Sequence, residues 1–303
     1  MVMENFKSRR AFLKTSATGM LGLMVLGNLG FKLSNRRNLC VGLQLYTIRD
    51  AMKADVRGSL KKVSELGYKN LELADYDNGK FYGFAPKEFK KMVKDLGMNI
   101  ISSHTKVEAA GITVDNAKKM ADDHAELGVK YCVQPWVNEE DRTIEKFKKM
   151  VGDWNEVGKI MKAAGIQFAY HNHNFEFKNM DGIVPYYDIF MTQLDADLVK
   201  MELDLYWAIK AGQDPVEMFK KYPGRFHLFH MKDMQTKKDP FYTIIKDDIT
   251  SVGAGLIDFK RILAAKETAG LKYMFVEDDN QGNGKPFEAI ELSINNLVTK
   301  ILK

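Results

Sequence analysis

Residues 164–173 read AGIQFAYHNH and combine three structural signals within ten residues. Gly165 follows an apolar helical pattern, and glycine accommodates the left-handed backbone at which helices commonly end. The next residues, Gln167–Tyr170, form a short apolar run of strand type. Two histidines, His171 and His173, follow that run directly. The stretch therefore predicts a helix end, a buried strand and a polar strand end in immediate succession.

The same helix-to-strand junction recurs along the chain. A leucine or alanine followed by glycine precedes a strand-type run at residues 66–67, 96–97, 127–128 and 269–270 as well. Five copies of one junction indicate a single repeating architecture. Eight strands are expected, at Cys40–Leu45, Asn70–Leu73, Asn99–Ser103, Tyr131–Gln134, Gln167–Tyr170, Leu198–Leu203, Phe226–His230 and Tyr273–Val276.

Helical periodicity fills the intervals between these strands. Alternating strands and helices with short connections imply a parallel sheet, and eight units over about 260 residues favour an α/β fold of the closed (β/α)8 TIM barrel type over a doubly wound sheet. No glycine-rich dinucleotide fingerprint follows the first strand, which removes the main support for a nicotinamide enzyme. The longest connection, residues 233–258, is expected to form a lid over the site. Helices are expected at Val56–Leu66, Pro86–Leu96, Asp115–Leu127, Thr143–Ala164, Asp188–Leu194, Pro215–Tyr222, Phe259–Ala269 and Phe287–Leu302.

The formal net charge of +5 is distributed unevenly along the chain. Residues 1–38 hold seven basic residues and one acidic residue, a net of +6, which leaves −1 for residues 39–303. A domain so close to neutrality lacks the basic surface that binding to a phosphate backbone needs. Nucleic acid is therefore not expected as a partner.

The basic N-terminal segment resembles an export signal. Ser8–Lys14 reads SRRAFLK, and an apolar run diluted by glycine covers Ala17–Phe31. Twin arginines before a weakly apolar run are typical of bacterial twin-arginine (Tat) signals. The run is shorter than the roughly 20 residues of a membrane span, so no stable membrane insertion is expected after signal removal. We expect residues 1–38 to be signal and linker, residues 39–303 to be the barrel, and the protein to be periplasmic; a basic amphipathic helix is the alternative for the segment.

Titratable side chains gather where the expected strands end. In such barrels the side chains at the C-terminal ends of the strands meet over one pocket. Four of the chain's six histidines fall at such ends, whereas His124 and His227 do not and are expected to be structural or surface residues. Mixed imidazole and carboxylate sets suit a divalent cation, Mn²⁺, Mg²⁺, Co²⁺ or Zn²⁺, because they leave positions open for water or substrate. The candidates are Glu72, His104, His171, His173, Glu202, Asp204, His230 and Glu277.

Six motifs, which span about residues 40–300, together resemble one protein family. They are VGLQLYTIRD (41–50), HNHNFEF (171–177), ELDLYW (202–207), HMKD (230–233), GAGLIDF (253–259) and Val276-Glu277. These motifs are similar to those of the sugar phosphate isomerase/epimerase family of xylose isomerase-like TIM barrels.

The resemblance implies a set of metal ligands. Ketose epimerases of this family take their ligands from strands five to eight, usually Glu, Asp, His and Glu, and the last three correspond to Asp204, His230 and Glu277. His171 occupies the position where the first Glu is usual. The implied ligands are therefore His171, Asp204, His230 and Glu277, and the family's usual pair of metal-bound glutamates is not complete.

Further residues are expected to act on the substrate. Glu277, or Glu176 acting across the sugar ring, is expected to remove a proton, while His173 and His104 donate hydrogen bonds to sugar oxygens. The Lys232 ammonium is expected to hold an anionic oxygen. Two more contacts with the substrate are expected, from Glu72 at the end of strand two and from Trp207, whose ring can stack on the C–H face of a sugar.

These roles predict an enzyme that acts on a small-molecule carbohydrate. A bound cation would polarise a carbonyl group and stabilise an enediolate, which suits a metal-dependent isomerase or epimerase. Because an exported enzyme is not expected to meet sugar phosphates, the expected substrate is a free sugar or ketosugar.

The same residues are compatible with other functions. Loss of a β-substituent from the same enediolate gives the alternative, a 3-keto-glycoside lyase or dehydratase. A non-catalytic periplasmic sugar-binding protein is the second alternative. The near-neutral charge and the export signal argue against the related apurinic-site endonuclease. The oligomeric state is left open by the sequence.

Overall fold

The computed structural model describes residues 41–105, 111–180, 184–236 and 248–303. Three sequence expectations lie wholly or partly outside these residues. They concern the export signal in residues 1–38, Cys40 at the start of the first strand, and the middle of the 233–258 connection, which was expected to form a lid.

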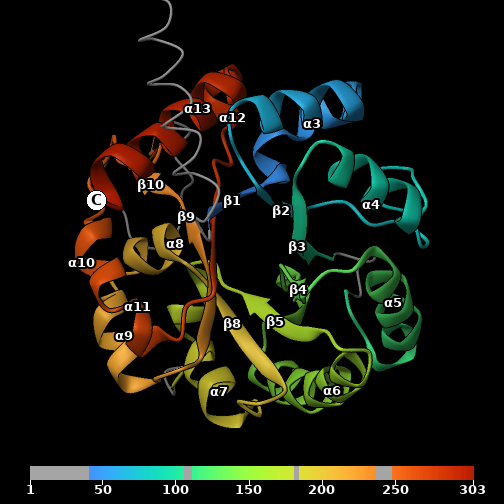
Figure 1. The fold of residues 1–303 in the computed structure, drawn as a ribbon. Coiled ribbons are helices and arrows are strands. Elements are labelled where there is room, and N and C mark those ends of the chain that lie inside the picture. The colour runs from blue at the N-terminus through green and yellow to red at the C-terminus, as the bar shows by residue number, and fades with distance from the viewer. Residues whose placement is uncertain (1–40, 106–110, 181–183, 237–247) are drawn as a thin grey trace, which may run out of the picture. The chain divides into compact units, whose positions relative to one another are not determined.

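Eight parallel strands close into a barrel with helices outside it (Figure 1), so the predicted (β/α)8 fold is confirmed. All eight expected strands are present; three have the expected bounds, and the ends of the other five differ by one residue. Neighbours around the barrel follow the order β1-β12-β9-β8-β5-β4-β3-β2. The strands are β1 (Val41–Gln44), β2 (Asn70–Leu73), β3 (Asn99–His104), β4 (Tyr131–Gln134), β5 (Gln167–His171), β8 (Val199–Asp204), β9 (Phe226–Met231) and β12 (Tyr273–Val276).

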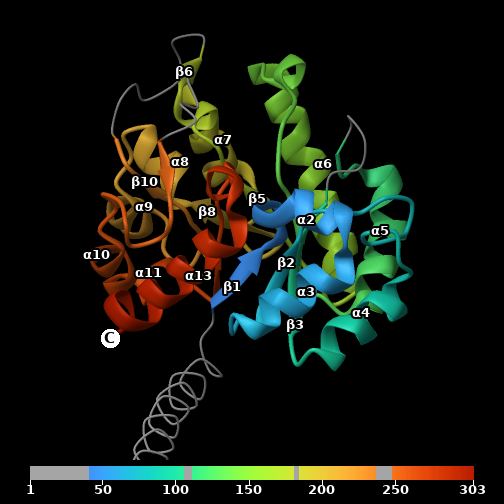
Figure 2. The same cartoon turned by 90° about the horizontal axis from the view of Figure 1, so that it is seen from above.

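The helices pack around the strands, and Figure 2 shows the barrel from a second direction. Three short helices, α2, α8 and α12, were not expected from the sequence, and the expected helix at 259–269 is divided in two. The helices are α2 (Arg49–Ala54), α3 (Val56–Glu65), α4 (Pro86–Asp95), α5 (Val114–Leu127), α6 (Ile144–Ala163), α7 (Tyr186–Gln193), α8 (Leu205–Lys210), α9 (Pro215–Lys221), α10 (Phe259–Ala264), α11 (Lys266–Ala269), α12 (Gln281–Gly284) and α13 (Pro286–Asn296).

The five predicted junctions have the expected backbone. Gly128 ends α5 with φ of 87°, and Gly270 ends α11 with φ of 85°. The glycines of the other three junctions also have positive φ. Each junction therefore turns the chain from a helix into the next strand, which is why the spacing of these glycines predicted the repeat.

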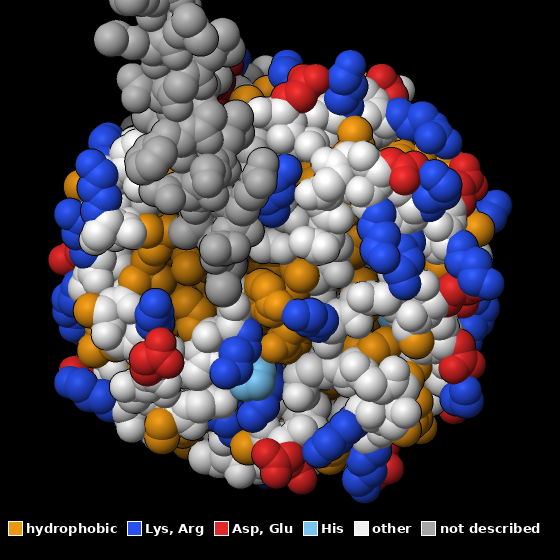
Figure 3. All heavy atoms as spheres, viewed as in Figure 1, with side chains coloured by type: hydrophobic (Ala, Val, Ile, Leu, Met, Phe, Trp, Pro, Cys, Tyr) orange, Lys and Arg blue, Asp and Glu red, His pale blue; other side chains and the backbone are white. Residues whose placement is uncertain are grey.

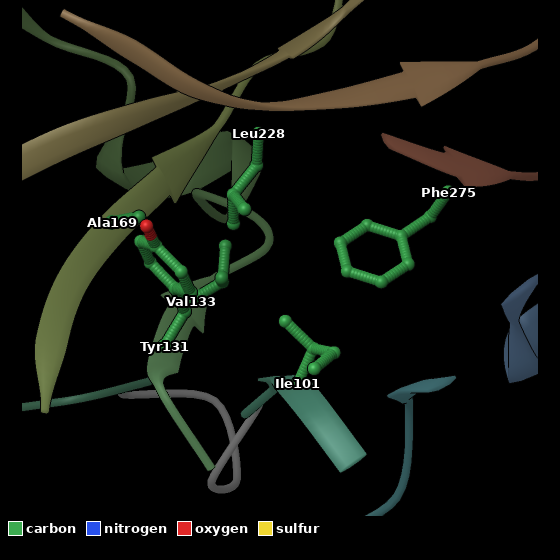
Figure 4. Packing of buried hydrophobic residues seen from close by; sticks show 6 residues of the cluster. All are labelled: Ile101, Tyr131, Val133, Ala169, Leu228 and Phe275. Atoms are coloured by element: carbon green, nitrogen blue, oxygen red, sulfur yellow. The ribbon is translucent and has the colours of Figure 1, made fainter. Parts of the chain in front are cut away.

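An apolar layer fills the barrel below the strand ends. Side chains from β3, β4, β5, β9 and β12 point toward one another in Figure 4. Burial of this kind supplies the main driving force for closing the barrel, at about 25 cal/mol for each Å² of apolar surface. The layer consists of Ile101, Tyr131, Val133, Ala169, Leu228 and Phe275.

Alternation along the strands places a polar layer directly above the apolar one. On β9, Leu228 belongs to the apolar layer, while the side chain two residues further on, His230, is buried among carboxylates. Lys232, two residues beyond that, reaches the cavity at the mouth. Because inward-facing side chains of a strand are two residues apart, their order in the sequence sets their depth inside the barrel.

The ends of the 233–258 connection are fixed by Asp233. Its carboxylate accepts hydrogen bonds from the backbone N–H groups of Met234, Gly253, Gly255 and Ile257, at 2.8–3.1 Å. Two short strands, β10 (Asp233–Met234) and β11 (Ile249–Thr250), pair antiparallel next to it. The aspartate of the HMKD motif therefore holds the GAGLIDF motif in place. A second short hairpin pairs β6 (Asn179–Met180) with β7 (Val184–Pro185).

The visible surface carries mixed charge. Figure 3 shows Lys and Arg side chains spread around one face of the protein, with Asp and Glu side chains among them. Within the described residues, no helix combines the length and the apolar character that crossing a membrane requires.

Candidate metal centre and active site

A cavity of about 670 Å³ opens at the C-terminal ends of the strands. Most of the residues that the sequence assigned to the site lie along it. His104, His171, His173, Trp207, Lys232 and Glu277 all line its wall or floor.

Four side chains from four strand ends converge at the floor of this cavity, and two of them, His171 and Glu277, line it. Each of them offers one ligand atom, and these atoms all lie within 4.8 Å of one another. All four side chains are buried. We call this group the outer cluster; it consists of His171, Asp204, His230 and Glu277. The structure thus brings together the four residues that the family resemblance implied as metal ligands.

Asp204 is positioned by its own helix cap. Its Oδ1 accepts a hydrogen bond from the backbone N–H of Trp207 at 3.0 Å and so caps α8. Its backbone N–H donates to Oδ1 of Asn172 at 3.1 Å. These contacts leave Oδ2 directed at the cluster, 3.5 Å from Nε2 of His171.

Lys232 provides the positive charge beside the outer cluster. Its Nζ lies 2.9 Å from Oδ2 of Asp204, 2.7 Å from Oε2 of Glu277 and 2.8 Å from Oδ2 of Asp279. Burial alone would lower the pKa of Lys232, but the three carboxylates hold it well above its ordinary range. The lysine is therefore a fixed cation at the floor of the cavity.

His230 and Glu277 form a charged pair. Nδ1 of His230 lies 2.8 Å from Oε2 of Glu277. Burial opposes the charge on both groups. Even so, the surrounding carboxylates, led by Glu202, hold the pKa of His230 well above its usual value, and Lys232 with His230 holds the pKa of Glu277 well below its own. Glu277 is consequently ionised in this arrangement.

Two carboxylates and two imidazoles form a deeper polar layer. Nε2 of His104 lies 2.6 Å from Oε2 of Glu202, and Nε2 of His230 lies 2.6 Å from Oε2 of Glu72. Burial raises the pKa of Glu72 to about 7 and that of Glu202 to about 7, and it lowers the pKa of His104 to about 4. We call Glu72, His104, Glu202 and His230 the inner cluster.

The position of Glu72 differs from the sequence expectation. It was expected to contact the substrate, but it is fully buried and is not among the residues that line the cavity. Its Oε2 accepts a hydrogen bond from Nε2 of Gln44 at 2.9 Å and contacts His230. The alternation of β2 places Glu72 one layer below the mouth, with Ala74 at the cavity.

Glu176 also differs from its expected role as a base. It is fully buried and does not line the cavity. Its carboxylate accepts the Tyr170 hydroxyl and, at 3.0 Å, the backbone N–H of His173. Burial raises its pKa to about 7. Glu176 thus holds the loop that carries His173 in place and does not reach the substrate space.

Aromatic rings form one wall of the cavity. The His173 ring meets Trp136 edge to face, with centroids 4.6 Å apart, and its centroid lies 5.5 Å from that of Trp207. The Arg142 guanidinium covers the Phe175 ring at 3.6 Å. Rings of this kind provide flat apolar faces suited to the C–H face of a sugar.

Two residues that line the cavity, Asp279 and Arg142, were not predicted from the sequence. Asp279 lines the cavity and pairs with Lys232, and burial raises its pKa to about 6. Its place three residues after the end of β12, close to Glu277 in the sequence, was an available signal. Arg142 belongs to the loop that follows η2 (Glu139–Asp141). It is not next to a strand end, so the pattern of polar residues at strand ends does not include it.

The two remaining histidines lie outside the site, as expected. His124 is buried on α5, where one ring nitrogen contacts the Met120 carbonyl at 2.7 Å and the other contacts the Thr105 hydroxyl at 2.9 Å. His227, near the start of β9, contacts the Tyr131 hydroxyl. Neither ring lines the cavity.

The outer cluster fits a divalent cation. Neither ring nitrogen of His171 has a hydrogen-bond partner among the residues that the structure describes, although both are buried. Leaving such groups unpaired costs free energy unless a ligand satisfies them. Two imidazoles and two carboxylates are the donor types that Zn²⁺ and similar ions take in catalytic sites. The donor set and the orphaned imidazole therefore point to the same kind of ligand.

Comparison with known proteins agrees with this architecture. The profile of a family described as xylose isomerase-like TIM barrel matches residues 60–295. A solved structure of a sugar phosphate isomerase/epimerase from Parabacteroides distasonis has a TM-score of 0.73 and 31% identity, and the match covers 87% of this chain and 95% of that one. The IolI protein, solved with a binding zinc atom, shares the fold at a TM-score of 0.68 and 17% identity, with 86% and 98% covered.

Two curated relatives match part of the chain. Inosose dehydratase of Lacticaseibacillus casei is 27% identical over 157 residues, which are 48% of this chain and 52% of that protein. Inosose dehydratase of Clostridium tetani is 29% identical over 150 residues, 45% of this chain and 49% of that protein. The chain therefore spans about half the length of the curated relatives it matches.

Proposed function

The chain belongs to the xylose isomerase-like TIM barrel family, and we propose that it is a sugar-processing enzyme that removes a proton from a carbon next to a carbonyl group. One observation carries this proposal: four ligand side chains converge at the floor of a cavity, and the ammonium of Lys232 lies 2.7 Å from the carboxylate of one of them, Glu277. The names of the relatives, which are isomerase/epimerase and inosose dehydratase, support the same class of substrate.

The roles of the residues follow from their positions. A divalent cation held by His171, Asp204, His230 and Glu277 would supply Lewis-acid polarisation of the substrate carbonyl. Glu277, kept ionised by Lys232, accepts the proton from carbon. When Glu277 takes up the proton its carboxylate loses its negative charge, and the Lys232 ammonium that contacted it then stabilises the negative charge that develops on the neighbouring oxygen.

The other cavity residues orient the sugar. His104 and His173 offer ring nitrogens to hydroxyl groups of the sugar, and Trp207 covers an apolar face of the ring. Glu176 acts one step away from the substrate, because it fixes the backbone of His173.

The cavity favours an uncharged sugar over a sugar phosphate. Lys232 is already engaged by three carboxylates, and Arg142 lies over the Trp136 and Phe175 rings. A phosphate would therefore find no uncommitted cation on these two side chains. We propose a free sugar, a ketosugar or a glycoside of a ketosugar as the substrate.

Two outcomes can follow the first proton transfer. Return of the proton to carbon gives a sugar isomerase or epimerase. Loss of a β-substituent gives a dehydratase or lyase, and His171 favours this second outcome, because it replaces the glutamate from which an epimerase would return a proton on the other face of the sugar. The inosose dehydratase relatives support it as well.

Solvent deuterium exchange tests the proposal. Zinc- or manganese-loaded protein is incubated in D₂O with a panel of free sugars and 3-ketoglycosides, and NMR follows deuterium entering carbon-bound positions. We expect exchange with at least one compound, and a loss of about 100-fold or more in Glu277→Gln. A retained carbon skeleton and a released substituent distinguish isomerisation from elimination.

Glu176→Gln is the matched comparison for that experiment. It removes a buried carboxylate that does not line the cavity, so exchange should persist at a rate well above that of Glu277→Gln. The proposal is wrong if the metal-loaded protein exchanges with no compound of the panel. A non-catalytic sugar-binding protein would instead bind a member of the panel without any exchange.

The location of the protein is a separate proposal. We propose that residues 1–38 are a twin-arginine export signal and that the barrel, residues 39–303, acts in the periplasm. The SRRAFLK motif and the concentration of positive charge in this segment support it.

A further inference from the structure

The ring of His230 faces two different groups of side chains. Its Nδ1 points toward the outer cluster, 2.8 Å from Glu277. Its Nε2 points the other way, toward the interior of the barrel, where it lies 2.6 Å from Glu72 and 3.3 Å from Glu202. One imidazole thus joins the outer and inner clusters, and each cluster uses a different nitrogen.

The four donor atoms of the inner cluster enclose a small space. Nε2 of His104 lies 2.6 Å from Oε2 of Glu202 and 3.5 Å from Oε2 of Glu72. Nε2 of His230 completes the ring of contacts at 2.6 and 3.3 Å. Donor atoms around a tetrahedral zinc ion, with bonds of about 2.0–2.2 Å, are separated by about 3.3 Å. Two of the observed spacings, 3.3 and 3.5 Å, are close to this value, and the two contacts of 2.6 Å would have to lengthen by about 0.7 Å to match it.

Burial and unmet bonding capacity also point to a ligand. Glu72, Glu202 and His230 are fully buried, and His104 is nearly so. Oε1 of Glu72 and Oε1 of Glu202 have no hydrogen-bond partner within the described part of the chain. Burying two carboxylates at this depth costs free energy unless a cation compensates their charge. Gln44, which donates to Glu72, already provides the kind of outer contact that orients a metal ligand.

We propose that Glu72, His104, Glu202 and His230 bind a second metal ion, zinc, beneath the outer cluster. The two imidazoles and two carboxylates form a set of four protein donors with no open position, and a closed set of four donors is the feature that distinguishes structural from catalytic zinc sites. Mg²⁺ and Ca²⁺ prefer six or more oxygen ligands and fit this site poorly. On binding both ions the His230 ring would release both of its N–H protons to solvent and offer one nitrogen to each ion. The inner ion ties β2, β3, β8 and β9 together and fixes the orientation of a ligand of the outer ion.

Two carboxylates on one strand allow a matched test. Glu202 and Asp204 lie two residues apart on β8; Glu202 contacts His104 and His230 in the inner cluster, whereas Asp204 belongs to the outer cluster. Apoprotein prepared with a chelator is reloaded with zinc, passed through a desalting column and analysed by elemental mass spectrometry. We expect about two zinc ions per chain in the wild type, about one in Glu202→Gln, about one in Asp204→Asn and almost none in His230→Gln.

The alternative is that the inner cluster holds protons and no metal. In that case the wild type and Glu202→Gln would both bind about one zinc ion and only Asp204→Asn would bind less, which would overturn the proposal. Because a buried variant can fail to fold, anomalous diffraction at the zinc edge from wild-type crystals provides an independent measurement. We expect two peaks, one beside each nitrogen of His230, and a single peak beside Nδ1 would refute the inner site.

Discussion

The histidines differ in what their ring nitrogens meet. Both nitrogens of His124 have partners within its own part of the fold, both nitrogens of His230 face carboxylates, and those of His171 have no hydrogen-bond partner among the described residues. A histidine whose two ring nitrogens both have partners in the protein needs no ligand and can serve a structural role. Orphaned nitrogens at a strand end indicate a ligand that binds there.

His124 should make the stability of the protein depend on pH. Burial lowers its pKa to about 4, against 6.5 for an exposed histidine. Between these values the unfolded chain takes up a proton that the folded protein does not, so stability falls as the pH drops from about 6.5 to about 4. The full loss is about 3 kcal/mol. We expect the unfolding free energy of the wild type, measured in urea, to fall by about 2 kcal/mol more between pH 7 and pH 5 than that of His124→Gln.

His227→Gln is the comparison for this prediction. Burial also lowers the pKa of His227 to about 4, but this side chain is only partly buried, so solvent weakens its contribution to stability. We therefore expect His227→Gln to change the pH dependence less than His124→Gln does. Equal pH slopes for the wild type and His124→Gln would contradict the prediction.

At the scale of elements, the alternation of the strands sorts side chains by depth. Ala169, His171 and His173 along β5 and its loop, like Leu228, His230 and Lys232 along β9, pass from the apolar layer to the cavity. A shift of one residue in either strand would exchange the buried cluster for residues that face the helices. The register of the barrel strands is therefore part of the site.

Gly42 and Gly152 provide a test of packing at this scale. A Cβ atom on Gly42 of β1 would lie 2.5 Å from Cδ1 of Phe275 and 2.9 Å from the carbonyl oxygen of Asn70. We expect Gly42→Ala to lower the unfolding free energy by about 1–3 kcal/mol, because Phe275 belongs to the apolar layer and cannot move freely.

Gly152→Ala is the control. This glycine lies inside α6, where an added Cβ meets nothing within 4 Å. Alanine should stabilise the helix by up to about 1 kcal/mol. Urea unfolding of both variants measures the two effects, and a neutral Gly42→Ala would show that the layer is packed less tightly than the structure indicates.

At the scale of the whole molecule, the polar clusters connect strands that are far apart in sequence. The inner and outer clusters draw on β2, β3, β5, β8, β9 and the end of β12. Ions bound by such clusters stabilise the folded barrel only, because the unfolded chain cannot bring the donors together.

Metal removal should therefore lower the melting temperature. An ion present at about 100 times its dissociation constant contributes about 2.7 kcal/mol. For a domain of this size that corresponds to a shift of about 5–10 °C. Calorimetry of zinc-loaded and chelator-treated protein measures the shift, and His230→Gln should abolish it. Equal melting temperatures with and without zinc would contradict the prediction.

The proposed export signal is tested on the full chain. Conversion of Arg9 and Arg10 to lysine should retain the protein in the cytoplasm, because the translocation receptor reads the arginine pair. The same change at Arg36 and Arg37, a pair that precedes the first barrel strand and not the glycine-rich apolar run of Ala17–Phe31, should leave export unaffected. Fractionation of bacterial cells followed by immunoblotting measures the outcome. Export of both variants would contradict the signal assignment.

The sequence predicted the fold well because its signals are local. Glycine after an apolar helix and short apolar runs report on neighbours a few residues away, and they located all eight strands. The short helix α8 was missed, since its six residues depend on the cap supplied by Asp204, and an aspartate at a strand end also reads as a metal ligand. The boundary between signal and barrel stays a prediction.

The sequence by itself determined which titratable residues end the strands, because strand alternation and strand length are properties of adjacent residues. Only the tertiary structure decided which of them meet. Glu72 lies a layer below the cavity, Glu176 turns toward its own loop, and Asp279 joins Lys232 at the floor. The stagger of strands in a closed barrel sets these depths, and it arises from pairings between residues distant along the chain.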